Sequence, residues 1–458
     1  MVEQPTFDAL VDFIENTTAN GLPPEVDEIT GRILLDTVGC MVAGVSSSPA
    51  TAVKAAFTSN SSGPSDIIGT THQLSPHDAA YVNAYTADVL DFEETLVSHP
   101  SAVVVAAALA VGQAQASTWQ QVHIAIALGY EIGSRIGRAL IPSAPIRREY
   151  AAEFWWKPVA ATIASGVLLG LDREPWKHAI GYATAASPAA RRGGFEFRPL
   201  SQLKANYGGQ AAAGVLGAYL AANGFLTHRA MLDGPRSYAQ LLGSDRWDSD
   251  LAVTGLGKDW LVGNVGFKVY PTCLYLHSLL ESIDGAVIVP RIPVTDVREV
   301  RAFVPAIICR ELAEKRPAGV IDAQFSAPIA AATLLLKREP HSQWFDDAWL
   351  TNPDMLAVAD RVRLIEDIEL TRLQNLDGHV RARIEVDLAD GTTVRAGVDT
   401  VRGNAARPLT GTELRDKFVR STTPHLGAAR AVQAADALLA AAGDARLEPV
   451  LDLLRPTH

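Results

Sequence analysis

The segment LDFEETLVSHPSA, residues 90–102, holds the side chains best suited to proton transfer. Asp91, Glu93 and Glu94 place three carboxyl groups within four residues, and His99 follows five residues later. Histidine titrates near neutral pH and a carboxylate beside it can orient the ring, so this combination is suited to general acid–base catalysis. A solvated turn followed by a histidine that caps a helix would use the same residues, and both interpretations stand at this point.

Four long cationic side chains lie in stretches otherwise rich in alanine, glycine and aromatic residues: Lys157, Arg191, Arg192 and Lys204. Each has an ordinary structural explanation, since a lysine after Phe-Trp-Trp can extend past the rings to solvent and an arginine pair can be solvated. If these cations converge, they form a pocket for a small carboxylate-rich molecule. His277 is a second candidate for proton transfer.

The bulk composition excludes several classes of protein. A chain of 458 residues predicts two or three domains, and 48% hydrophobic with 20% charged residues is typical of a soluble globular protein. The net charge of −11 argues against nucleic acid or an anionic membrane as the main partner. Three cysteines without a CxxC pair favour a reduced, cytoplasmic location. The most apolar run, residues 102–111, is about half the roughly 20 residues that a membrane span needs, and predicts a buried helix.

Several signature motifs are absent from the sequence. It contains no GxGxxG after a strand, no Walker loop, no GxSxG elbow and no HExxH. The eleven histidines do not pair at the spacing of metal ligands. Nucleotide-dependent, serine-hydrolase and zinc-protease functions therefore have no support, and a metal site is not expected.

The elements that must position these residues are mostly helices. Up to about residue 265 the apolar spacing is helical, with a helix start at Ser75-Pro76 and another at Thr118, where Gln121 completes a capping box. After about residue 267 the pattern changes: 297–305 and 380–388 are typical of strands, and a turn at 390–391 leads into a third. Residues 323–337 and the tail from 411 return to helix.

This pattern predicts a mainly α fold with two domains. The large domain is all-helical and spans residues 1–266, completed by residues 403–458. The smaller domain is an α+β lid that spans residues 267–402. Domain closure is expected from such a layout.

Several stretches resemble one protein family along nearly the whole chain and in the same order. The stretches are DTVGCMVAG from Asp36, NAYTADVLDFEETLVSHPS from Asn83, GYEIGSRIG from Gly129, LKANYGGQAAAGVLGAYLAANGF from Leu203, KVYPTCLYLHS from Lys268 and RPAGVIDAQFSAPIA from Arg316. The chain resembles the MmgE/PrpD family, which includes 2-methylcitrate dehydratase, cis-aconitate decarboxylase and iminodisuccinate epimerase. The resemblance implies a helical domain with an α+β lid, a homodimer, a site between the two domains, and chemistry without a metal or organic cofactor.

The resemblance also implies site residues. Its motifs carry catalytic positions over to Asp91, Thr95, His99, Lys204 and His277. The substrate-binding candidates are Lys157, Arg191, Arg192, Lys268 and Tyr150. We expect the two histidines to be the acid/base pair, with Asp91 orienting a histidine, Thr95 donating a hydrogen bond and Lys204 anchoring a carboxylate.

Three positions differ from the family's usual pattern. Glu93-Glu94 replaces a pair of aspartates, Lys157-Pro158 replaces a histidine-proline pair, and Ile329 replaces a tyrosine. The last two positions handle protons in decarboxylase-like members, so these exchanges argue against decarboxylation.

The function that follows is proton abstraction next to a carboxylate. We expect a dehydratase-like lyase that acts on a small di- or tricarboxylic acid by α-proton abstraction and β-elimination. An epimerase of a small dicarboxylate, with Lys157 and a histidine as two opposed bases, is the first alternative. A decarboxylase is the second, and a non-catalytic protein that binds an acid or a partner is the third.

Overall fold

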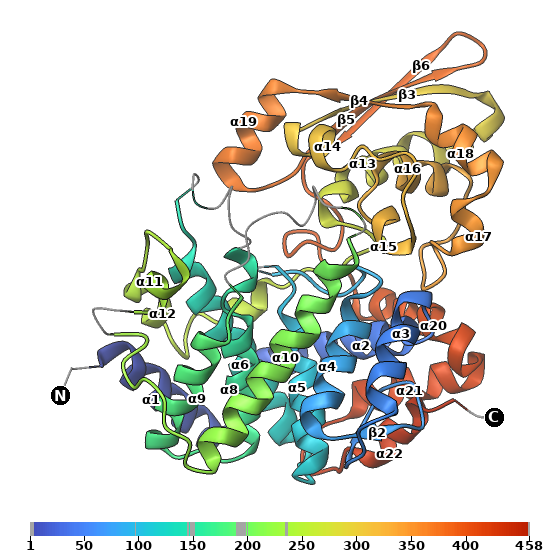
Figure 1. The fold of residues 1–458 in the computed structure, drawn as a ribbon. Coiled ribbons are helices and arrows are strands. Elements are labelled where there is room, and N and C mark those ends of the chain that lie inside the picture. Colours follow the sequence, from blue (N-terminus) through green and yellow to red (C-terminus); the bar gives the residue numbers. More distant parts are fainter. Residues whose placement is uncertain are drawn as a thin grey trace.

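The computed structural model describes residues 4–96, 98–143, 146, 152–188, 198, 200–233 and 237–456. Its fold is mainly α, as the sequence predicts. In Figure 1 most helices gather in the lower part of the molecule, and a smaller part that contains a four-stranded sheet lies above them. The smaller part is coloured mainly yellow and orange, and the red C-terminal helices lie with the other helices in the lower part.

The lower part contains helices from both ends of the chain. The N-terminal ones are α1 (Pro5–Asn20), α2 (Pro24–Gly44), α3 (Ser48–Thr58), α4 (Pro76–Asp88), α5 (Pro100–Ala114), α6 (Trp119–Leu140), α8 (Lys157–Leu168), α9 (Arg173–Ala185), α10 (Ser201–Ala222), α11 (Tyr238–Leu242) and α12 (Ser249–Val253). The C-terminal ones are α20 (Gly411–Leu426), α21 (Ala428–Ala440) and α22 (Glu448–Leu451). The C-terminal helices pack back on the N-terminal ones, chiefly through α20 against α2.

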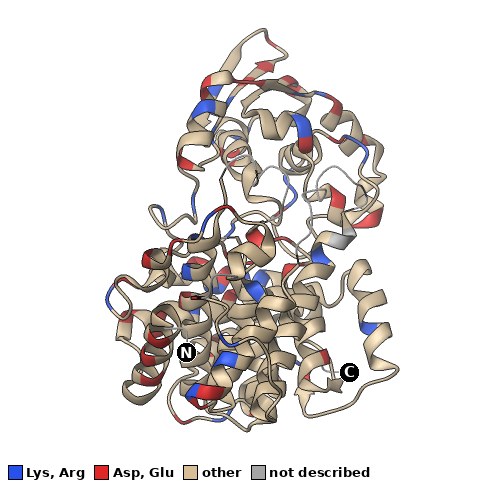
Figure 2. Cartoon of the chain, turned by 60° about the vertical axis from the view of Figure 1, so that its left-hand side comes forward, with Lys and Arg blue, Asp and Glu red and all other residues tan. Residues whose placement is uncertain are grey.

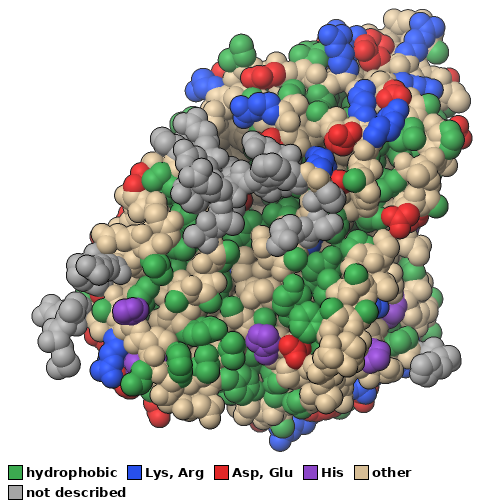
Figure 3. Space-filling model, in the orientation of Figure 1, with side chains coloured by type: hydrophobic (Ala, Val, Ile, Leu, Met, Phe, Trp, Pro, Cys, Tyr) green, Lys and Arg blue, Asp and Glu red, His purple; other side chains and the backbone are tan. Residues whose placement is uncertain are grey.

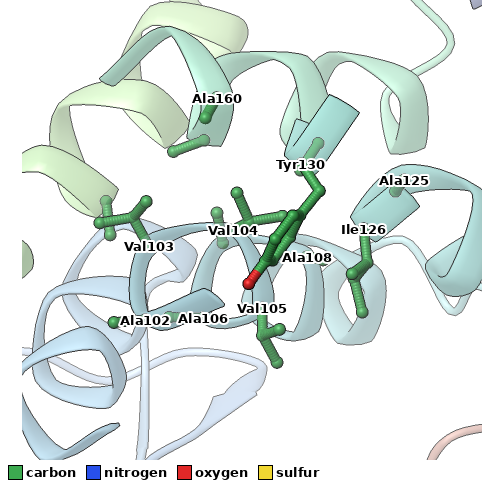
Figure 4. Close-up of a cluster of buried hydrophobic side chains, with 14 of the residues drawn as sticks. Ala102, Val103, Val104, Val105, Ala106, Ala108, Ala125, Ile126, Tyr130 and Ala160 are labelled. Carbon is green, nitrogen blue, oxygen red and sulfur yellow. The ribbon is translucent and has the colours of Figure 1, made fainter. Parts of the chain in front are cut away.

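Helix α5 lies at the centre of this part and contains the apolar run of the sequence. All residues from Pro100 to Gly112 are buried, and α5 contacts α4, α6, α8 and α10. In Figure 4, Tyr130 of α6 reaches across the valines and alanines of α5. Small residues permit this packing: a Cβ added to Gly133 of α6 would lie 2.4 Å from Cβ of Ala160 in α8. Such a distance is far below van der Waals contact, so the two helices approach as closely as they do only because residue 133 is glycine.

The smaller part, called the lid region below, runs from α13 to β6. Its strands are β3 (Val297–Val304), β4 (Val362–Glu366), β5 (Ala382–Leu388) and β6 (Thr393–Val398). Its helices are α13 (His277–Ile283), α14 (Ala306–Glu311), α15 (Val320–Ala323), α16 (Ala327–Leu335), α17 (Asp347–Leu350), α18 (Pro353–Asp360) and α19 (Ile368–Asp377). The strand order is β4-β3-β5-β6, with β4 parallel to β3 and the other pairs antiparallel.

The sheet of the lid region has one apolar face and one charged face. Helices α13, α16 and α18 contact its strands and help to form a hydrophobic cluster with them. On charged positions of neighbouring strands, Arg301 pairs with Glu385 at 2.8 Å and with Asp387. Figure 2 shows both acidic and basic segments along this sheet. Along β5 apolar residues alternate with charged ones, and this is the period-two pattern that predicts a strand; both β3 and β5 are confirmed.

Two expectations about strands were wrong. The segment before residue 266 is not all-helical, because β1 (Ser65–Asp66) pairs with β2 (Gln73–Leu74). Strand β4 was also missed. The two-residue strands are shorter than the four to eight residues over which a period-two pattern can be recognised, and the five residues of β4 do not alternate because apolar Leu364 and Ile365 are adjacent. Pairing with a neighbouring element, rather than local pattern, decides both.

Among the described residues, no single helix combines the length and the apolar composition needed to cross a bilayer. Helices α2 and α3 meet that test only together, and the chain bends by 88° between them. On the face shown in Figure 3, hydrophobic side chains form small groups between polar ones over the helices.

Candidate active site

Asp91 lies at the centre of a buried cluster of charged side chains, in the loop that follows α4. Its backbone has a positive φ of 51°, a conformation that aspartate tolerates better than most residues. Its N–H donates to the carbonyl oxygen of Asp88 at 2.8 Å, which closes a tight turn at the end of the helix. This turn directs the Asp91 carboxylate toward two lysines from other parts of the chain.

Lys204 of α10 and Lys268 share the carboxylate of Asp91. Nζ of Lys204 lies 2.9 Å from Oδ1 of Asp91 and 3.1 Å from Oδ2 of Asp88. Nζ of Lys268 lies 3.1 Å from the same Oδ1 and donates to the backbone oxygen of Asp91 at 2.8 Å. All four side chains are buried.

These ion pairs fix the charges of the lysines. Burial by itself raises the pKa of Asp91, but Lys204 and Lys268 outweigh it and hold that pKa well below its usual range. Burial likewise opposes the charged form of Lys204, yet Asp88 and Asp91 raise its pKa above the ordinary value. Lys204 and Lys268 are therefore permanent cations at neutral pH, suited to stabilising negative charge and unsuited to giving up a proton.

Asp88 and Glu93 form a carboxyl pair beneath this cluster. Burial raises the pKa of Asp88 well above its usual value, although Lys204 acts in the opposite direction. Burial also raises the pKa of Glu93, but Lys268 and His99 outweigh it and set this pKa at about 2. These opposite directions favour the protonated form at Asp88 and the charged form at Glu93. Sequence reasoning missed Asp88 because an acid in the last turn of a helix carries no chemical signal.

His99 is held through one of its two ring nitrogens. Nδ1 lies 3.0 Å from the backbone oxygen of Glu94 and 3.1 Å from Oε1 of Glu93. Both partners are acceptors, so Nδ1 carries the proton and Nε2 keeps its lone pair. Burial and the charge of Lys268 lower the pKa of His99 to about 4, so the ring is neutral at pH 7. Glu93, rather than Asp91, is the acid whose side chain contacts the His99 ring among the described residues.

The part-exposed side of the cluster is formed by Thr95, Ser98 and His99. The His99 side chain is 17% exposed, whereas the acids and lysines behind it are almost fully buried. Thr95 is fixed through its backbone: its N–H donates to the oxygen of Gly266 at 2.7 Å, and the Gly266 N–H donates back at 2.8 Å. Among the described residues of the cluster, these three are the ones that solvent partly reaches, with His99 at the boundary.

Glu94 is the third buried carboxyl group of the loop, after Asp91 and Glu93. Its Oε1 accepts a hydrogen bond from the backbone N–H of Ser101 at 2.8 Å, in the first turn of α5. Burial raises the pKa of Glu94 to about 7. A carboxyl group at this helix start satisfies a backbone donor that has no partner within the helix.

Lys157 is the first residue of α8 and is fully buried, which excludes the alternative in which it extends past the aromatic rings to solvent. Its Nζ donates to Oγ of Ser98 at 3.1 Å and lies 3.9 Å from the centre of the Tyr207 ring and 4.5 Å from that of Phe154. Burial lowers the pKa of Lys157 to about 7.

His277 begins α13 in the lid region. Its ring meets that of Tyr270 edge-on, with centroids 5.4 Å apart. Its buried Nε2 has no hydrogen-bond partner among the described residues. Burial and Lys268 lower its pKa to about 3, so this histidine is also neutral. Its electrostatic interactions with Lys268 and Asp91 connect it to the cluster.

Lys417 of α20 supports the cluster from the C-terminal end of the chain. Its Nζ lies 2.7 Å from Oδ1 of Asp36 and donates at 2.6 Å to the backbone oxygen of Phe92, the residue after Asp91. The two contacts tie α2, α20 and the site loop together. Sequence reasoning missed Lys417 because 325 residues separate it from Phe92.

Asp91, Glu93 and His99 each have an oxygen or nitrogen atom that could bind a metal ion, and these atoms lie within 4.8 Å of one another. One ion could contact all three at such distances. However, two ammonium groups already contact Oδ1 of Asp91, and the histidine nitrogen facing Glu93 carries a proton. The arrangement is that of an ion-pair and hydrogen-bond network, and we do not assign these residues as metal ligands. Three predicted substrate-binding residues, Tyr150, Arg191 and Arg192, lie outside the described residues.

Comparison with known families covers most of the chain. Residues 8–249 match the MmgE/PrpD N-terminal domain and residues 270–441 match the MmgE/PrpD C-terminal domain. The chain belongs to the MmgE/PrpD family. The range that matches the N-terminal domain contains Asp91, His99, Lys157 and Lys204, whereas Lys268 falls between the two matched ranges.

Three curated members of the MmgE/PrpD family are similar over nearly their whole length. The cis-aconitate decarboxylase of Aspergillus terreus is 24% identical over 470 residues, covering 96% of this chain and 94% of that protein. A cis-aconitate decarboxylase-like protein of Aspergillus oryzae is 23% identical, covering 97% and 96%. Human cis-aconitate decarboxylase is 22% identical, covering 87% and 83%. Proteins named for action on a carboxylic acid thus share the fold that positions the cluster.

Proposed function

We propose that this protein is a lyase that acts on a small di- or tricarboxylic acid. It removes a proton from the carbon next to a carboxylate and expels a β-leaving group, in the simplest case water. The observation that carries the proposal is the state of His99: its Nδ1 is occupied by Glu93 and Glu94, which leaves the lone pair on Nε2, and the same buried cluster holds the ammonium groups of Lys204 and Lys268.

The charges of the cluster suit this chemistry. Removing a proton next to a carboxylate builds further negative charge on an anionic molecule, so the site must stabilise that charge. Lys204 and Lys268 are cations fixed in place by Asp91, and they need no reorganisation when the charge develops. Thr95 supplies a hydroxyl on the part-exposed side of the cluster.

Binding of an anion makes a neutral histidine with a low pKa more basic. Substrate carboxylates near His99 favour its protonated form, which raises its pKa toward neutrality. The proton that it takes is then stabilised by Glu93, whose carboxylate lies 3.1 Å from Nδ1. His277 is the second acid/base candidate from the lid side.

Decarboxylation is the second candidate because the curated relatives are named for it. The positions that differ from the family pattern count against it. Ile329 is a fully buried hydrocarbon side chain in the hydrophobic cluster of the lid region, and it cannot donate the hydrogen bond of a tyrosine. Epimerisation of a dicarboxylate remains the alternative that uses the same first step.

We further propose that the protein works as two domains, residues 1–266 with 403–458 and residues 267–402. Two hydrophobic clusters support this division, one within the helices and one that fills the lid region and reaches Tyr85, Val89 and Phe92 beside the site. A homodimer is proposed from the family resemblance. Light scattering of the purified protein tests it, because a monomeric mass would contradict it.

Proton NMR in D2O with a panel of small acids tests the proposed reaction. The panel contains citrate-like, aconitate-like, malate-like and aspartate-derived acids, with carbon-13 labels in their carboxyl groups. New vinyl signals establish elimination, and labelled bicarbonate establishes decarboxylation. Deuterium at an α-carbon without either product shifts the assignment to an epimerase. No change with any acid contradicts the proposal.

A further inference from the structure

One buried cation has no part in the ion-pair network around Asp91. Among the described residues, no carboxylate oxygen lies within 4.0 Å of the Lys157 ammonium, whereas Lys204 has two such contacts. The partners of Lys157 are a hydroxyl group and the faces of two aromatic rings. The chain therefore contains lysines held in two different ways around one loop.

We propose that Lys157 is a proton-transfer residue of this site: it delivers a proton from Nζ to the departing oxygen, while His99 takes the α-proton. This inference rests on the proposed function and assigns the second proton that elimination requires. Lys157 and His99 are linked by sequence as well as space, because the Nζ of Lys157 donates to Oγ of Ser98, the residue before His99. Lys157 thus contacts, from the start of α8, the loop that carries His99.

The backbone of the loop fixes this relationship. Ser98 has a positive φ of 77°. Its backbone carbonyl oxygen accepts a hydrogen bond from the N–H of Leu96 at 3.0 Å, which closes a tight turn. Its hydroxyl is thereby held toward Lys157 while the next residue carries the catalytic ring. Ser98 is a positioning residue in this account, because it acts through Lys157.

The surroundings of Lys157 do little to favour its protonated, charged form. The titratable groups that face it are Asp88 at the end of α4, Glu93, Glu94 and His99 in the loop, Glu153 before α8, and Tyr207 of α10. Burial outweighs the acids among them and brings the pKa of Lys157 to about 7, close to the operating pH at which a general acid works best. Its place at the N-terminus of α8 acts in the same direction, because the helix dipole disfavours a cation there.

The proposed step balances. Nε2 of His99 takes the α-proton, and the electrons of the C–H bond form the new C=C bond. The bond from the β-carbon to the hydroxyl oxygen breaks, and that oxygen takes the proton of Lys157 and leaves as water. His99 ends protonated and Lys157 ends neutral, and exchange with solvent restores both.

Lys157→Arg separates proton transfer from charge. Arginine keeps the positive charge but does not release a proton near neutral pH. We expect this variant to lose elimination by about 100-fold or more in kcat with KM within a few-fold of wild type. It should still exchange the α-proton with D2O, because His99 is unchanged. Lys157→Met, which keeps the length of the side chain, should behave alike, and Lys258→Arg, at an exposed lysine, is the matched control.

Elimination by Lys157→Arg near the wild-type rate would overturn the proposal, and so would equal loss of exchange and elimination in folded variants. Melting temperatures of both variants establish that they are folded. An NMR titration of carbon-13-labelled lysine, with Lys157→Arg used to assign the signal, does not depend on any substrate. A midpoint near 7 is expected, and a midpoint near 10 contradicts the proposal. This titration stands even if no acid in the panel reacts, so failure of the proposed function and failure of the Lys157 assignment remain distinguishable.

Discussion

Nδ1 of His99 lies 3.1 Å from Oε1 of Glu93, and this contact decides which ring nitrogen is available to a ligand. The Glu93 carboxylate also raises the pKa of His99 against the larger effects of burial and Lys268. The sequence places the two residues six positions apart, and the loop between them folds back to bring the side chains together.

Glu93→Gln tests this contact. The amide removes the negative charge that stabilises protonated His99, and it can donate as well as accept, so the ring is no longer confined to one tautomer. We expect kcat/KM on the true substrate to fall by about 100-fold, with the acid limb of its pH profile moved to lower pH. Unchanged activity with an unchanged acid limb would show that Glu93 does not act through His99.

Asp91→Asn tests the shared counter-ion. Asparagine tolerates the positive φ of this position, so the change removes charge without adding backbone strain. Lys204 and Lys268 would then be buried cations that lack most of their compensation, and we expect the free energy of unfolding to fall by about 3–5 kcal/mol. Urea denaturation measures it. Asp436→Asn, which breaks an exposed pair with Arg415, is the control and should change stability little.

Glu94→Gln tests the buried carboxyl group through pH. The folded pKa of Glu94 is about 7 against 4.5 for an exposed glutamate, so between these values the folded state holds a proton that the unfolded state has released. Stability of the wild type therefore falls as pH rises across this window. Glutamine does not titrate, so the variant should gain about 3 kcal/mol relative to wild type between pH 4 and pH 8. A difference that is constant with pH would contradict the raised pKa.

Asp322→Ala tests a contact between the lid region and the helix that carries Lys204. Oδ1 of Asp322 accepts the N–H of Leu200 at 2.7 Å, and Arg198 lies 3.6 Å from the same oxygen. Loss of a hydrogen bond to a charged group costs about 1.5–3 kcal/mol locally. We expect faster hydrogen exchange of the Leu200 amide and a lower kcat. Asp360→Ala, on the exposed Arg316 pair, should change neither.

Local sequence patterns predicted the elements that depend on local interactions. Ser75 caps α4 by accepting the N–H of Asp78, and Thr118 and Gln121 form the capping box that begins α6. The hairpin of β5 and β6 follows from alternation and from an Asp-Gly turn at residues 390–391. These signals lie within a few residues of the structure that they specify.

The site could be predicted only in part, because its charges are set by distant residues. The carboxylate of Asp91 meets Lys204 and Lys268 across intervals of more than a hundred residues. That no carboxylate of the described residues lies within 4.0 Å of the Lys157 ammonium is equally invisible in sequence, since it depends on how the acids are placed in space. The family resemblance indicated which residues gather, whereas the proton on Nδ1 of His99 follows only from the positions of Glu93 and Glu94.

The most direct test of the central claim compares His99→Gln with wild type. It measures the rate at which each protein exchanges the α-proton in D2O, with the acid that the panel identifies as substrate. Glutamine has a similar size and cannot take a proton at neutral pH, and the melting temperature of the variant establishes its fold. The account predicts that deuterium enters the α-carbon with wild type and at least about 100-fold more slowly with the variant. Exchange at the wild-type rate in folded His99→Gln would contradict it and would transfer the role of base to another residue.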